Sequence, residues 1–145
     1  TSRPSRCPLR RRRRQAAKSG WFVDPDADWT STYDEFDFRV GGHERMTSRG
    51  QDGTTVVFAV HYLDIVEDER VIYSYEMEVG GQRISASLAS IELAATPTGV
   101  GTRLTLTEHG LYLDGLDNSI DRERGTNELI DNLGAWLDAA TEPVH

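Results

Sequence analysis

Apolar and polar residues alternate with a period of two along most of the chain between residues 33 and 109, which predicts β-strands. Six segments carry the pattern: residues 33–40, 43–48, 54–66, 70–79, 83–94 and 102–109. Residues 24–32, before the first segment, show no period and are predicted as loop. Short turn sequences separate the segments, and Gly80-Gly81 suits a two-residue hairpin turn that requires positive φ. The pattern therefore predicts an antiparallel meander.

The faces of two segments can be assigned from the alternation. In the first segment, Phe36, Phe38 and Val40 fall on one face and predict a half-buried strand. The third segment is apolar on both faces, and simple alternation places Ile65 on the same face as Val57. Such a strand is either covered on both sides or meets another subunit, so a homodimer is a possible assembly.

The C-terminal part of the chain has helical periodicity. Residues 118–140 predict one long amphipathic helix, because apolar residues recur on one stripe. Seven residues turn a helix by about 700°, which is close to two full turns. Arg122, Leu129 and Trp136 therefore lie on one line, and an arginine points inward with the apolar stripe. Six strands followed by one helix predict an α+β fold with the helix against one face of the sheet.

Composition limits the architecture and the partners. A chain of 145 residues with 37% hydrophobic residues suits a single domain. The formal net charge is −8, and the first 22 residues hold eight basic residues and no acidic residue. The remainder is strongly acidic, so we expect no nucleic-acid partner. The chain holds no apolar run long enough for a membrane span, and a single cysteine fits a reducing compartment, so we expect no membrane insertion and a cytoplasmic location.

Residues 1–20 form an atypical basic segment. Pro4 and Pro8 interrupt any early helix, and five consecutive arginines follow at residues 10–14. Three interpretations remain open: a disordered arm, a tether for nucleic acid or an acidic partner, and a shifted reading frame or mis-assigned start that rejoins the domain near Gln15 to Trp21. Resequencing of the coding DNA would test the last of these.

Motifs for cofactor or metal chemistry are missing from the sequence. It contains no glycine-rich phosphate loop, no nucleophile elbow, no cysteine pair and no two histidines at metal-ligand spacing. We therefore predict no cofactor, no metal and no catalytic residue.

The residue pattern supports a more specific hypothesis than any catalytic motif, namely a cavity between the sheet and the helix. Glu108 shares the parity of Leu104 and Leu106, so it leans to the same side as Arg122 and the two charges would flank the cavity mouth. Alternatively, both charges lie at element ends, where they pair or are hydrated, and the interior is simply packed. The predicted lining consists of Phe36, Phe38, Tyr73, Tyr75, Met77, Ser87, Leu106 and Leu129.

Several motifs together resemble one known family. They are WF at residues 21–22, DFRVGGHERM at 37–46, HYLDIVEDERVIYSYEM at 61–77, GTRLTLTEHG at 101–110 and DGLDNSIDRERGTNELIDNL at 114–133. They closely resemble bacterial homologues of the activator of heat shock protein 90 ATPase, in the START and birch-pollen-allergen-like (SRPBCC) superfamily. The match covers residue 21 to about residue 140. Family members begin with a strand and an amphipathic helix, which the basic segment does not supply.

The resemblance implies a helix-grip fold, in which a curved antiparallel sheet wraps around a long C-terminal helix and leaves an internal hydrophobic cavity. It places the domain at residues 21–145, after the atypical segment 1–20. The cavity candidates also include Trp21, Met46, Phe58 and Leu133.

The expected function is binding of a small hydrophobic molecule, such as a lipid, a polyketide or an aromatic metabolite, because the family's range includes such ligands. One alternative is a cyclase or hydrolase with Glu108, His61 or Tyr75 as the acid or base. The other is a module that binds a chaperone or a regulator, which would require an exposed apolar patch on strand 55–66.

Overall fold

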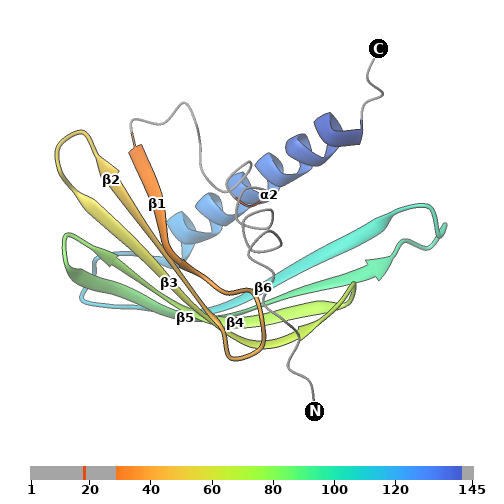
Figure 1. Cartoon of the computed structure of the whole chain (residues 1–145), viewed down its shortest axis with the longest axis horizontal. Coiled ribbons are helices and arrows are strands. Elements are labelled where there is room, and N and C mark those ends of the chain that lie inside the picture. The colour runs from red at the N-terminus through yellow and green to blue at the C-terminus, as the bar shows by residue number, and fades with distance from the viewer. Residues whose placement is uncertain (1–17, 19–28, 142–145) are drawn as a thin grey trace. The chain divides into compact units, whose positions relative to one another are not determined.

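The structure, a computed structural model, describes Lys18 and residues 29–141. Contacts divide the chain into two units, Trp29–Asp117 and Asn118–His145 with Thr1–Asp28. The first unit is a six-stranded sheet, and the described part of the second contains one long helix (Figure 1). The elements are β1 (Trp29–Phe36), β2 (His43–Gly50), β3 (Thr55–Val66), β4 (Arg70–Val79), β5 (Gln82–Ala95), β6 (Thr102–Tyr112) and α2 (Ser119–Thr141).

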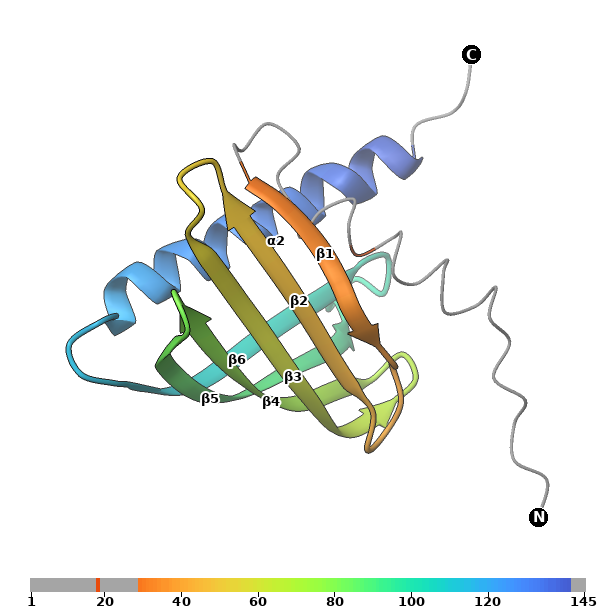
Figure 2. The same ribbon diagram turned by 60° about the vertical axis from the view of Figure 1, so that its left-hand side comes forward.

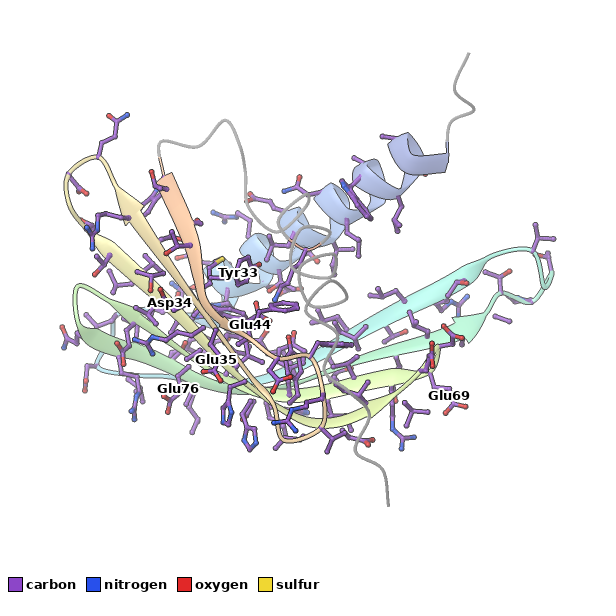
Figure 3. All side chains as sticks on the ribbon, viewed as in Figure 1. Tyr33, Asp34, Glu35, Glu44, Glu69 and Glu76 are labelled. Carbon is purple, nitrogen blue, oxygen red and sulfur yellow. The ribbon has the colours of Figure 1, made fainter. Side chains whose placement is uncertain are left out.

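The strands lie in the order β1-β2-β3-β4-β5-β6, and each pairs antiparallel with its sequence neighbours. The predicted meander is therefore confirmed. Figures 1 and 2 show that the sheet is strongly curved, so it has a concave and a convex face. Tyr33 and Glu44 point to the concave side, whereas Glu76 points to the convex side (Figure 3). The sheet and the C-terminal helix together give the predicted α+β class, consistent with the helix-grip fold.

The first strand differs from its prediction. It begins at Trp29, inside the predicted loop, and ends at Phe36 rather than at residue 40. A turn follows, in which the amide of Asp37 donates to the carbonyl of His43 at 2.8 Å. Gly42 fits here because a Cβ at this position would lie 2.1 Å from the carbonyl oxygen of Asp37. Val40 is consequently 57% exposed, which contradicts its predicted inward position.

A bulge in β3 corrects the predicted position of Ile65. The pairing with β4 shifts between Tyr62 and Asp64, so one extra residue, Leu63, lies in the strand. Beyond the bulge, Ile65 faces Val71 and packs against the same core cluster as Tyr62. The prediction that Ile65 shares the face of Val57 was wrong, because simple alternation has no place for an extra residue.

The turn between β4 and β5 has the predicted conformation. Gly80 and Gly81 have φ values of 59° and 80°. Positive φ at both central residues defines the type I′ turn, whose twist matches that of the paired strands. The two glycines thus fix the register of β4 against β5.

The core of the sheet unit lies on the concave face. Val60, Tyr62, Tyr75 and Ala89 form its buried cluster. Their positions follow from the register, since Val60 faces Tyr75 across β3 and β4. Partly buried side chains pack against this cluster: Phe38, Phe58, Ile65, Val71, Tyr73 and Met77. The centre of the face is therefore aromatic rather than aliphatic.

Helix α2 matches the predicted helix to within one residue at each end. Asn118 caps its first turn, because its Oδ1 accepts a 2.9 Å hydrogen bond from the amide of Asp121. Helical geometry places Arg122, Leu129 and Leu133 on one face of α2. In the part of the chain that the structure describes, neither this helix nor any other segment forms a helix apolar enough to span a membrane.

The predictions for residues 1–20 concern positions outside the described residues, apart from Lys18. The three interpretations of that segment, and the single domain at residues 21–145, stay predictions.

Candidate functional site

Two tyrosine–carboxylate pairs lie on the concave face of the sheet. The first joins β2 to β3. Glu44 is 1% exposed, and the hydroxyl of Tyr62 donates a hydrogen bond to its Oε2. Glu44 faces Val60 directly, so Tyr62 reaches it diagonally from two residues farther along β3. The phenol donor compensates for the burial of this carboxylate, which would otherwise be strongly destabilising.

The second pair spans three strands. The hydroxyl of Tyr75 on β4 donates a 2.5 Å hydrogen bond to Oε1 of Glu108 on β6. Strand β5 lies between them and presents Ser87 opposite Tyr75 and Ala89 opposite Glu108. Because both of these side chains are small, the phenol and the carboxylate meet above β5.

Tyr73 connects the two pairs electrostatically. Burial, followed by the negative charges of Glu108 and Glu44, raises the pKa of Tyr73 to about 12. Its ring centroid lies 6.3 Å from that of Tyr62 and 5.9 Å from that of Tyr75. Burial and Glu44 also raise the pKa of Tyr62. Both phenols are therefore neutral hydrogen-bond donors at physiological pH.

Ser87 adds a buried hydroxyl beside the second pair. The residue is 7% exposed, and its Oγ has no hydrogen-bond partner among the described residues. On the next strand it faces Gly110, where an added Cβ would lie 3.3 Å from the Ser87 Oγ. The same Cβ would lie 2.7 Å from the hydroxyl of Tyr112. Glycine at residue 110 thus leaves room for the phenol of Tyr112, which lies over this position beside Ser87.

The sheet brings most of the predicted cavity residues to one face. Strand pairing places nine of them on the concave face: Phe36, Met46, Phe58, Tyr73, Tyr75, Met77, Ser87, Leu106 and Glu108. Phe38 lies beyond β1, where its ring packs edge-on against Tyr62 at 5.0 Å. Trp21 lies outside the described residues. Arg122, Leu129 and Leu133 belong to α2 in the other unit, so the pairing of Arg122 with Glu108 at a cavity mouth stays a prediction.

Sequence reasoning missed Glu44 and Tyr62 as site residues. The alternation of the strand could have revealed Glu44, since it stands two residues before the predicted inward residue Met46 and therefore on the same face. A glutamate at an inward position predicts a buried polar site when a neighbouring strand carries a side chain that can donate a hydrogen bond to it.

His61 is not part of this face. It lies on the convex side of β3, where its ring stacks on His43 with centroids 4.7 Å apart. His61, one of the three alternative candidates for a cavity acid or base, therefore lies on the wrong side of the sheet for that role. Within residues 29–141 and Lys18, no three His, Cys, Asp or Glu side chains are grouped to hold a metal ion.

Comparison with known structures gives the same fold. A protein of Rhizobium loti has 43% sequence identity and a TM-score of 0.72, with coverage of 84% of this chain and 81% of that one. An uncharacterised protein of Rhizobium leguminosarum has 35% identity and a TM-score of 0.75, with coverage of 86% and 80%. A Chromobacterium violaceum protein has 23% identity and a TM-score of 0.67, over 83% and 79% of the two chains, which supports the fold alone.

Among curated proteins there is no match to this chain. The sequence profile of a family described as "Activator of Hsp90 ATPase homolog 1-like protein" matches residues 13–138, which is most of the chain. The matched range contains all six strands and almost all of α2. On this basis the chain belongs to the family of Activator of Hsp90 ATPase homolog 1-like proteins.

Proposed function

We propose that the protein binds a small hydrophobic molecule on the concave face of its sheet, in the cavity that a helix-grip fold implies. One observation carries the proposal: large apolar and aromatic side chains meet on this face and remain partly exposed. Phe58, Tyr73 and Met77 pack against the core cluster, yet each keeps accessible surface. Apolar walls with a few placed polar groups are typical of small-molecule sites.

The polar groups of the face would orient such a molecule. The two tyrosine–carboxylate pairs are held by hydrogen bonds between side chains of different strands, so their positions are fixed before a ligand arrives. Fixed polar groups lower the entropic cost of binding. The apolar walls supply affinity, and the polar pairs supply specificity.

The test is retention of a ligand. Native mass spectrometry of protein purified from its own source should show a bound small molecule, and the same spectra give the number of subunits. In parallel, the neutral dye Nile red should bind the ligand-free protein with a large gain in fluorescence.

Two variants on one strand give a matched comparison. Phe58→Ala removes a ring from the concave face, and we expect the dye to bind roughly tenfold more weakly. Val57→Ala removes apolar atoms from the adjacent, convex position of β3 and should leave dye affinity unchanged. Absence of both a retained molecule and dye binding, or equal effects of the two variants, would refute the proposal.

A further inference from the structure

Two histidines form a stacked pair on the convex face of the sheet, opposite the face of the proposed ligand site. His43 on β2 faces His61 on β3, and their ring centroids lie 4.7 Å apart with an angle of 10° between the ring planes. Both residues are exposed. Neutral imidazole is the commonest metal ligand among side chains, through either ring nitrogen. The pair is therefore a candidate metal site, which strand pairing forms and local sequence spacing does not reveal.

The backbone holds the two histidines at the shorter of the two cross-strand spacings. The amide of Gly41 donates to the carbonyl of Tyr62 at 2.8 Å, and the amide of Tyr62 donates to the carbonyl of Gly42 at 3.0 Å. Hydrogen-bonded and non-hydrogen-bonded pairs alternate along an antiparallel ladder, so the next pair, His43 and His61, is non-hydrogen-bonded. Side chains approach each other most closely at such pairs.

The concave side of the sheet fixes the same register. Glu44 follows His43 in β2, Tyr62 follows His61 in β3, and the hydroxyl of Tyr62 donates a hydrogen bond to the carboxylate of Glu44. A shift of register between β2 and β3 would break this buried bond and separate the histidines. The two imidazoles are therefore held next to each other before any ion binds.

The measured ring separation matches the geometry of two imidazoles on one ion. A metal–nitrogen bond of about 2.0–2.1 Å places each ring centroid roughly 3.2 Å from the metal. For nitrogen–metal–nitrogen angles between about 90° and 109°, as in square-planar and tetrahedral sites, the two centroids are then about 4.5–5.2 Å apart. The observed 4.7 Å lies inside this range. Coordination consequently requires rotation of the exposed rings but no separation of the strands.

The surroundings of the pair leave room for further ligands. Ser74, which faces His61 from β4, has a small side chain. Among the described residues, no third His, Cys, Asp or Glu completes a metal-binding group with the pair. Water, or a donor atom of another molecule, would therefore occupy the remaining coordination positions. The formal net charge of −8 attracts cations to the protein as a whole.

We propose that His43 and His61 together chelate one divalent transition-metal ion, with Cu²⁺ bound more tightly than Ni²⁺ or Zn²⁺. Each imidazole supplies one nitrogen, and the order of the ions follows from the general preference of nitrogen ligands among first-row metals. The site lies on the face opposite the apolar one. It is therefore independent of the proposed function, and the failure of either proposal leaves the other intact.

Calorimetric titration of the full chain with CuCl₂, in a buffer that does not coordinate copper, tests the site. The protein carries no affinity tag, and Cys7→Ser in every sample prevents reduction of copper by the thiol. The tightest binding event should involve one ion per chain. His43→Gln and His61→Gln should each weaken it at least about tenfold, because the second nitrogen of a chelate binds at a high effective concentration.

His109→Gln is the matched control. His109 lies in the same row of the convex face, on β6, but Ser74 and Leu88 on the intervening strands separate it from His61. Its substitution should leave the affinity for copper unchanged.

Two further measurements locate the ion. Substoichiometric Cu²⁺ should broaden the imidazole proton signals of His43 and His61 before those of His109, and the three variants assign these signals. Copper should also raise the melting temperature of the protein but not that of His61→Gln, because the ion binds a pair that only the folded chain presents.

Equal copper affinity with and without His61→Gln would overturn the proposal, and so would equal losses in His61→Gln and His109→Gln. If a variant does not fold, as judged by circular dichroism, the broadening pattern of the protein with all its histidines decides. Simultaneous broadening of His43, His61 and His109 would then refute the site.

Discussion

Tyr75 and Glu108 form a 2.5 Å hydrogen bond although a whole strand, β5, separates their own strands. This bond ties β4 to β6 above the small side chains of β5. It is therefore a cross-link within the sheet that is independent of the backbone ladder.

The first prediction concerns the strength of this cross-link. A double-mutant cycle of Tyr75→Phe and Glu108→Gln should give a coupling energy of about 1–2 kcal/mol, because a hydrogen bond to a charged acceptor is lost in either single variant. Unfolding in urea measures the four free energies. Additive effects of the two substitutions would contradict the bond.

The second prediction concerns the buried pair. Tyr62→Phe should lower the free energy of unfolding by about 2–3 kcal/mol, because Glu44 stays buried without its phenol donor. The double variant Tyr62→Phe, Glu44→Leu should recover part of this loss, since it removes donor and acceptor together. Equal stability of the single and double variants would show that the phenol does not stabilise the carboxylate.

The third prediction concerns alkaline stability. The pKa of Tyr73 is raised from 10.0 to about 12 in the folded protein. The folded protein thus keeps a proton that the unfolded chain releases, so the associated stability is complete below about pH 10 and is lost as the pH rises towards 12. The full loss amounts to about 3 kcal/mol for a shift of this size.

Urea unfolding between about pH 9 and pH 11.5 would measure the third prediction. Tyr73→Phe should flatten the decline relative to the unsubstituted protein, and a phenolate titration at high pH should lose the step near pH 12. An unchanged slope in the variant would assign the decline to other groups.

The fourth prediction concerns the turn between β4 and β5. Gly80→Asn should leave stability unchanged or raise it slightly, because asparagine tolerates positive φ in a type I′ turn. Gly80→Val should lower the free energy of unfolding by more than about 1 kcal/mol, because a β-branched residue is strained there. No atom lies within 4 Å of an added Cβ at Gly80, so crowding does not confuse the comparison. Thermal denaturation of both variants provides the measurement.

Much of the architecture could be predicted because it depends on local pattern. Strand β4 has the predicted bounds, since its alternation is uninterrupted, and the glycines at its end determine the next turn. The helix was predictable because its cap, Asn118, and its apolar period agree.

The departures have non-local causes. The start of β1 at Trp29 depends on pairing with Gly50, which local composition does not reveal. The partners of Glu44 and Glu108 likewise depend on register across one strand or two, which no single segment specifies. The polar centre of the concave face could therefore not be assembled from sequence alone, although most of its apolar surroundings could.

The bulge in β3 makes this strand tolerant of a change in length. Tyr62 faces Tyr73 and Asp64 faces Ile72, so Leu63 is the one residue without a position in the ladder. A chain that lacked residue 63 would keep both pairs and restore a regular strand, whereas a deletion elsewhere in β3 would turn the following side chains to the opposite face. Among relatives of this protein, single-residue gaps in β3 should therefore gather at this position.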